Sequence, residues 1–81
     1  MKSLTLTPRQ LQVAALLIEA CSDKEIGQKL GITDRTVKAH FHQLYKKFGI
    51  TSGIKRVKLA VLLYRRELID EDVTDTRANN D

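Results

Sequence analysis

The chain has 81 residues, a net charge of +4 and a hydrophobic fraction of 42%, a size and composition that indicate one small folded domain without room for a separate sensor domain. It contains no apolar run of about 18 residues, as a membrane-spanning helix requires, and its N-terminus lacks the apolar core of a signal peptide. A single cysteine excludes an internal disulfide, so we expect a cytoplasmic protein without a membrane partner.

The charge is unevenly distributed along the chain. Residues 1–69 hold thirteen Lys and Arg against five Asp and Glu, whereas residues 70–81 hold one Arg against five acids. A basic body favours a polyanionic partner, because each neutralised phosphate releases condensed counterions. The alternative explanation of the basic balance is solubility alone. Because residues 70–81 are polar and lack periodicity, we expect a domain over 1–69 followed by a disordered acidic tail.

The first predicted helix begins after Thr7. Thr7 at the N-cap, Pro8 at the first helical position and Gln10 at the third form a capping signature. The following residues predict a helix to about Glu19 or Ala20. Its inward face is expected to comprise Leu11, Ala14, Ala15 and Ile18, broadened by Val13, Leu16 and Leu17.

Residues 22–49 predict two helices joined by a tight turn. Ser22 and Glu25 form a capping box for the first of them. Gly31 follows where a sharp turn needs a residue that tolerates positive φ. Thr33 can cap the next helix, which is expected to span residues 34–48.

This third helix is predicted to be amphipathic. Its apolar residues recur at spacings of four, three and four and form one stripe: Val37, Phe41, Leu44 and Phe48. At about 100° per residue, the opposite side carries Arg35, Ala39, His42, Gln43 and Lys46, with Lys38 at its edge. A helix with a buried stripe and long hydrogen-bond donors on its outer face suits the major groove of DNA.

A fourth helix is expected to start at Thr51 and Ser52. Its inward stripe is predicted to be Ile54, Val57, Val61, Tyr64 and Leu68, and a second apolar face remains, formed by Leu59, Leu62 and Leu63. A helix that is apolar on two faces is usually buried on both. We expect a second copy of the chain to cover Leu59, Leu62 and Leu63, in a C2 homodimer that suits a palindromic site. The alternative is a broad contact with the first helix.

Catalysis and metal binding have no support in the sequence. Cys21 has no neighbouring base to activate it. His40 and His42 lie two positions apart on a helix and cannot share a face, so they make a poor metal pair. Carboxylate pairs, phosphate loops and nucleophile constellations are missing. The sequence therefore predicts neither an enzyme nor a cofactor.

Five short motifs occur in an order and spacing that resemble one family. They are LTPR at 6–9 followed by Gln10 (LTPRE in the family), SDKEIG at 22–27 (SNKEIA), LGIT at 30–33 (LGIS), TVKAH at 36–40 (TVKxH) and KFGI at 47–50 (KLGV). Over residues 6–60 the chain is similar to the DNA-binding domain of LuxR-type (GerE-type) transcriptional regulators.

The resemblance implies an all-α, four-helix, bundle-like helix-turn-helix domain without a wing. It implies a cytoplasmic transcriptional regulator whose third helix enters the major groove of double-stranded DNA and whose fourth helix forms a homodimer. RNA polymerase is a further candidate partner. The positions expected to face bases are Lys38, Ala39 and His42, to which the outward helical face adds Arg35. The positions expected to approach phosphates are Lys24, Thr36 and Lys47, to which the same face adds Lys46.

A second hypothesis is a protein-interaction module that pairs with another LuxR-type regulator through Leu59, Leu62 and Leu63 without binding DNA itself. Asp23 motivates it, because a carboxylate in place of the family's Asn repels a nearby phosphate. Gly53 is a second reason for this hypothesis, because this glycine replaces an Arg that is common at the start of the family's fourth helix. The acidic tail is a third reason. Binding to duplex DNA at low salt would separate the two hypotheses.

Overall fold

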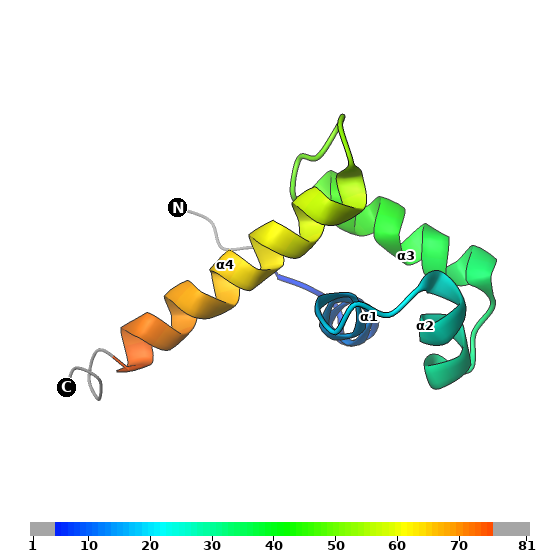
Figure 1. The fold of residues 1–81 in the computed structure, drawn as a ribbon, viewed down its shortest axis with the longest axis horizontal. Coiled ribbons are helices and arrows are strands. Elements are labelled where there is room, and N and C mark those ends of the chain that lie inside the picture. The colour runs from blue at the N-terminus through cyan, green and yellow to red at the C-terminus, as the bar shows by residue number, and fades with distance from the viewer. Residues whose placement is uncertain (1–4, 76–81) are drawn as a thin grey trace.

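The computed structural model describes residues 5–75, with side chains described up to Arg66. Four helices follow in order: α1 (Pro8–Ile18), α2 (Asp23–Leu30), α3 (Asp34–Lys47) and α4 (Lys55–Asp75). Within residues 5–75 there is no β-strand and therefore no wing. Helices α1, α2 and α3 form a compact body from which α4 extends (Figure 1). The predicted all-α helix-turn-helix fold is confirmed.

The starts of the first three helices are fixed by the capping residues that the sequence predicts. The Thr7 hydroxyl accepts a hydrogen bond from the Gln10 backbone N–H at 3.1 Å, and the Ser22 hydroxyl accepts one from Glu25 at 3.1 Å. Thr33 caps α3 in the same way by accepting from the Thr36 backbone N–H at 3.1 Å. Each such cap typically stabilises a helix by about 1 kcal/mol, which is why these helix starts can be found from local sequence.

The core draws side chains from all four helices. Its fully buried members are Val13, Ile26, Val37, Leu44 and Leu59. The predicted stripe of α3 is confirmed, because Val37, Phe41 and Leu44 are buried and Phe48 is half-buried beside them. In α1, however, the buried face consists of Gln10, Val13, Ala14 and Leu17. Leu11, Ala15 and Ile18 of the predicted inward face are exposed, so α1 is rotated relative to the prediction.

The two faces of α4 are the reverse of those predicted. Leu59 is 0% and Leu63 5% exposed, whereas Val61 is 43% and Tyr64 55% exposed. The expected use of Leu59 and Leu63 as a dimer interface is therefore wrong, because both side chains lie in the core of their own chain. Leu62 is half-buried between the two faces. Arg56 lies on the same side of the helix as Leu59 and Leu63, and its contacts with α2 and α3 set the rotation of α4.

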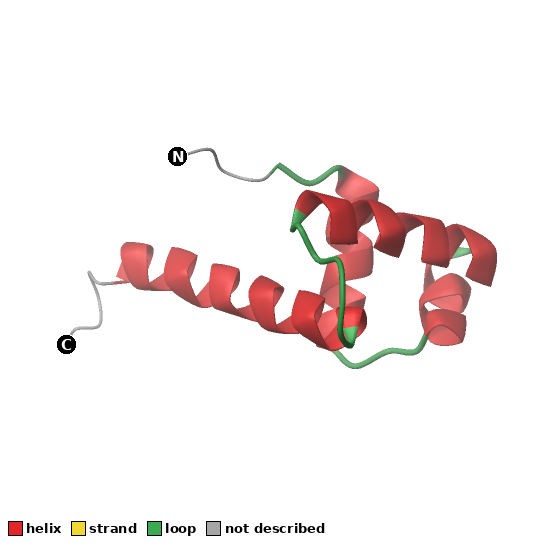
Figure 2. Cartoon of the chain, turned by 90° about the horizontal axis from the view of Figure 1, so that it is seen from above, coloured by secondary structure: helices red, strands yellow, loops and turns green. Residues whose placement is uncertain are grey.

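The ends of α4 also differ from the prediction. The helix begins at Lys55, and Gly53 precedes it with a φ of +79°, so this glycine does not weaken the helix interior. The helix continues to Asp75, past the predicted domain end at residue 69, because no Pro or Gly follows Gly53 to stop it. Residues 76–81 of the predicted acidic tail lie outside the described residues. The second half of α4 projects away from α1–α3 in two perpendicular views (Figures 1 and 2).

The turn after α1 contains a strained residue. Ala20 has a φ of +65° and is the one non-glycine residue with positive φ in the described part of the chain. Because a left-handed conformation costs an L-residue about 1–2 kcal/mol, Ala20→Gly is expected to stabilise the domain by about 1 kcal/mol. That gain corresponds to a rise in Tm of about 4–8 °C, measurable by circular dichroism.

The matched control is Ala15→Gly in the exposed middle of α1. It should lower stability by about 1 kcal/mol, because glycine is a poor helix former. If both glycine variants lost stability to the same extent, Ala20 would not be strained.

Candidate nucleic-acid interface

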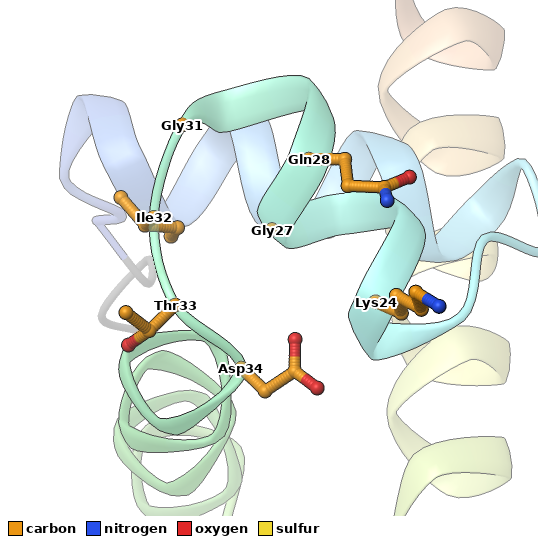
Figure 3. Close-up of a pocket in the computed structure, with 7 residues that line it drawn as sticks. All are labelled: Lys24, Gly27, Gln28, Gly31, Ile32, Thr33 and Asp34. Atoms are coloured by element: carbon orange, nitrogen blue, oxygen red, sulfur yellow. The ribbon is translucent and has the colours of Figure 1, made fainter.

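Helices α2 and α3 are held together through the turn that joins them. Gly31 ends α2 in the left-handed conformation, with φ +70°. Gly27 lies so close to the turn that a Cβ at this position would be 2.7 Å from the Ile32 carbonyl oxygen. Figure 3 shows the hollow on this side, with the Asp34 carboxylate pointing into the space between α2 and the start of α3. The turn therefore fixes how α3 stands relative to α2.

The outer face of α3 carries the residues predicted to read bases. Arg35, Lys38, Ala39 and His42 are all exposed, opposite the buried stripe. Three of the residues predicted to contact phosphates are exposed as well: Lys24 on α2, and Thr36 and Lys46 on α3. The structure thus brings the predicted base contacts together on one accessible helix face. Their contact with DNA stays a prediction.

Lys47, the remaining predicted phosphate contact, takes part in a network inside the molecule. Its ammonium donates to the Thr5 carbonyl at 2.6 Å and to the Gln10 side-chain oxygen at 2.8 Å. Gln10 in turn donates to Gln43 at 3.2 Å. Two of the three ammonium protons of Lys47 therefore tie α3 to the start of α1, and one remains for a phosphate.

A second anchor, which the sequence analysis missed, joins α4 to the rest of the domain. The Arg56 guanidinium donates to Asp23 Oδ1 at 2.6 Å and to the Cys21 carbonyl at 2.9 Å, and lies 4.5 Å from the centre of the Phe41 ring. Asp23 is therefore paired, which offsets the repulsion of a phosphate expected from its carboxylate. Nearby, burial raises the pKa of the Tyr45 phenol, with Arg56 opposing and Asp23 adding to the effect, so the phenol stays neutral near pH 7.

The described residues offer neither a metal-binding cluster nor a membrane-spanning helix. No group of three or more His, Cys, Asp and Glu side chains there could hold a metal ion. In the same part of the chain, no helix combines the length and the apolar character needed to cross a membrane.

A family model described as bacterial regulatory proteins, luxR family, matches residues 4–62. The chain belongs to the luxR family. The match covers α1, α2, α3 and the start of α4, which are the parts that build the exposed face of α3. LuxR-family proteins are DNA-binding transcriptional regulators and not enzymes.

Curated luxR-family relatives match the chain over one part of their own length. The transcriptional regulatory protein MctR of Rhizobium johnstonii is 39% identical over 56 residues, which is 69% of this chain and 26% of MctR. LiaR of Bacillus subtilis is 35% identical over 66 residues, which is 82% of this chain and 30% of LiaR. The nitrate/nitrite response regulator NarL of Escherichia coli is 33% identical over 63 residues, which is 78% of this chain and 28% of NarL. The chain thus spans less than a third of these relatives, and no solved structure matches it significantly.

Proposed function

We propose that this luxR-family domain binds double-stranded DNA in a sequence-specific manner and regulates transcription, with α3 in the major groove. The observation that carries the proposal is the exposed face of α3, where Arg35, Lys38, Ala39 and His42 stand opposite the stripe that packs into the core. Lys and Arg pair naturally with guanine O6 and N7, and Ala contacts a thymine methyl group. MctR and LiaR, two relatives of this chain, are transcriptional regulatory proteins, which supports the same function.

Phosphate contacts from Lys24, Thr36, Lys46 and Lys47 would position the domain on the duplex without reading sequence. A protein with these contacts would act in the bacterial cytoplasm, where the DNA lies. RNA polymerase stays a candidate partner of the bound regulator, with no residue assigned to that contact.

The salt dependence of binding tests this electrostatic part of the proposal. Three lysines at phosphates predict that log K falls with log salt at a slope of about −3 per chain, or about −5 for a dimer. Fluorescence anisotropy with a duplex selected from a random pool measures the slope. A flat salt response would contradict the basic-face mechanism.

The exposed apolar face of α4 is the proposed homodimer interface. Val57, Val61 and Tyr64 lie on this face, and two hollows flank it, one between α4 and the loop after α3 and one between α4 and α1. A ridge of side chains between two hollows can pack against its own copy across a twofold axis. Exposed apolar surface of this kind marks an interaction site. Leu62 lines the first hollow and would lie at the edge of the interface.

Val61→Asp is expected to convert the dimer into a folded monomer. Two carboxylates would be buried against each other at the interface, whereas in the free chain Val61 is already 43% exposed. Sedimentation velocity gives the oligomeric state, and circular dichroism reports the fold. Gln12→Asp, which adds the same charge at an exposed position of α1, should leave the dimer intact. Wild-type protein that stays monomeric at high micromolar concentration, both alone and on DNA, would exclude this interface.

The interaction module that modulates another regulator without binding DNA is the second candidate, because the same apolar face could receive a relative of this chain. Two of the observations that motivated this hypothesis carry less weight in the structure, because Asp23 is paired with Arg56 and Gly53 lies before the helix. A gel shift at low salt separates the candidates. Absence of any duplex binding would favour the module.

A further inference from the structure

Lys47 is an exposed lysine whose ammonium group is held in place by oxygens of its own chain. It donates to the Thr5 backbone carbonyl at 2.6 Å and to the Gln10 side-chain oxygen at 2.8 Å. Both acceptors are neutral oxygens, and neither belongs to a carboxylate. The two contacts therefore fix the ammonium without cancelling its positive charge, unlike the ion pair between Arg56 and Asp23.

Gln10 is the partner whose side chain determines that the charge survives. The residue is 3% exposed, and its oxygen accepts from the Thr7 backbone N–H at 3.0 Å as well as from Lys47. Its amide nitrogen donates to the Gln43 side chain on α3 at 3.2 Å. Reversing the amide would set its NH2 group against two groups that can only donate. The buried amide therefore presents its oxygen to Lys47 in one orientation.

Lys47 stands on the flank of α3, between the buried stripe and the outer face. At about 100° per residue, it falls within about 20° of Thr36 and about 40° of Gln43. Arg35 and His42 lie more than about 100° away, on the outer face. A helix with its side chains is about 10–12 Å across and the major groove about 12 Å wide, so the flanks of a helix in the groove face the phosphate backbones. With α3 in the groove, the Lys47 ammonium would meet a phosphate.

We propose that Gln10 is a positioning residue for DNA binding, which holds Lys47 on the flank of α3 and leaves its full charge to a phosphate. Gln10 itself is buried and acts through Lys47 alone. The motif LTPRE of the family has a glutamate at this position, which would hold the same ammonium but also neutralise it. The glutamine of this chain retains that positive charge. The inference rests on the proposed DNA-binding function and on the proposed phosphate contact of Lys47.

Gln10→Glu tests the inference, because it keeps the acceptor for Lys47 and adds a negative charge. Thr7 and Lys47 would both donate to the new carboxylate, so its burial is compensated. Once paired with it, the ammonium loses its net attraction for a phosphate. Gln12→Glu is the control, since it adds the same charge two positions along α1, on the exposed side of the helix. Circular dichroism checks that both variants retain the helical fold.

The expected result is weaker binding to every duplex without a change in base preference. Losing one phosphate contact should lower affinity about eightfold at about 0.1 M salt and make the slope of log K against log salt shallower by about one. Gln10→Glu should differ from Gln12→Glu by these amounts in fluorescence anisotropy, on selected and random duplex alike. Lys47→Gln, which removes the charge itself, should show the same changes relative to wild type. Equal binding by the two glutamate variants, or a loss that Lys47→Gln does not share, would overturn the inference.

A measurement on the free protein separates the holding of Lys47 from its role on DNA. NMR order parameters of the side-chain ammonium groups should show Lys47 to be more restricted than Lys46, the exposed lysine beside it. Gln10→Met has a side chain of similar size without the amide oxygen, so it should raise the mobility of Lys47. Equal mobility of the two lysines in wild-type protein, or no change in Gln10→Met, would overturn the inference even if the wild type binds DNA. Wild-type protein that binds no duplex would instead remove the proposed function itself.

Discussion

Replacing Leu59 with alanine is expected to remove a large part of the domain's stability. Leu59 is 0% exposed and packs in the core that all four helices share. Truncating a fully buried leucine costs about 2–5 kcal/mol, through lost apolar burial and the cavity that remains. A domain of this size has a total stability of about 4–12 kcal/mol, so the loss is severe. Urea denaturation followed by circular dichroism measures it.

Val61→Ala is the matched control, two positions along the same helix. Because Val61 is 43% exposed, its truncation should cost less than about 1 kcal/mol in the isolated chain. Both variants are to be compared at concentrations where the protein is monomeric, since Val61 also lies in the proposed interface. Equal losses, or a larger loss for Val61→Ala, would mean that α4 is rotated the other way.

Lys38→Ala is expected to lower affinity for the selected site far more than affinity for random duplex. A lysine that reads guanine contributes about 1–3 kcal/mol of discrimination, which corresponds to a loss of about 5- to 150-fold at the cognate site. Affinity for random duplex should fall only about a few-fold, because Lys38 contributes to that binding through its charge alone. Fluorescence anisotropy with both duplexes gives the two numbers.

Lys46→Ala provides the comparison, because Lys46 is an exposed lysine of α3 that is proposed to contact a phosphate. It should weaken binding to both duplexes by the same factor and make the salt slope shallower by about one. If Lys38→Ala behaved like Lys46→Ala, Lys38 would be a phosphate contact and base reading would rest on its neighbours.

The parts of the fold that could be predicted from sequence are those set by local interactions. Thr7, Ser22 and Thr33 each cap a helix through a backbone N–H three residues away, so three helix starts were recognisable. The buried stripe of α3 could also be predicted, because its apolar residues fall on one side only. The exposed face that carries Lys38 and His42 followed from that stripe.

The rotation of α1 and α4 could not be predicted, because each helix has apolar residues on more than one face. The hydrophobic periodicity then fits burial of either face about equally well. Contacts between residues distant in sequence decide which face is buried. In α4 the deciding residue is Arg56, which bonds Asp23, 33 positions earlier. In α1 it is Gln10, a polar residue that is buried because Lys47 and Gln43 satisfy it. Gln10 lies on the same helical face as Val13, Ala14 and Leu17. This spacing was the one feature of the sequence that could have indicated the rotation of α1.

The anchoring of α4 by Arg56 has a consequence for the arrangement of the DNA target. Arg56 bonds Asp23 at the start of α2 and Cys21 before it, and lies over the Phe41 ring of α3, so these contacts hold the proposed dimer helix against the proposed DNA-reading helix. In a dimer built on α4, the separation of the two reading helices is therefore fixed. Such a protein accepts one spacing between the two halves of its operator, close to one turn of the double helix, and discriminates against operators with longer or shorter spacers.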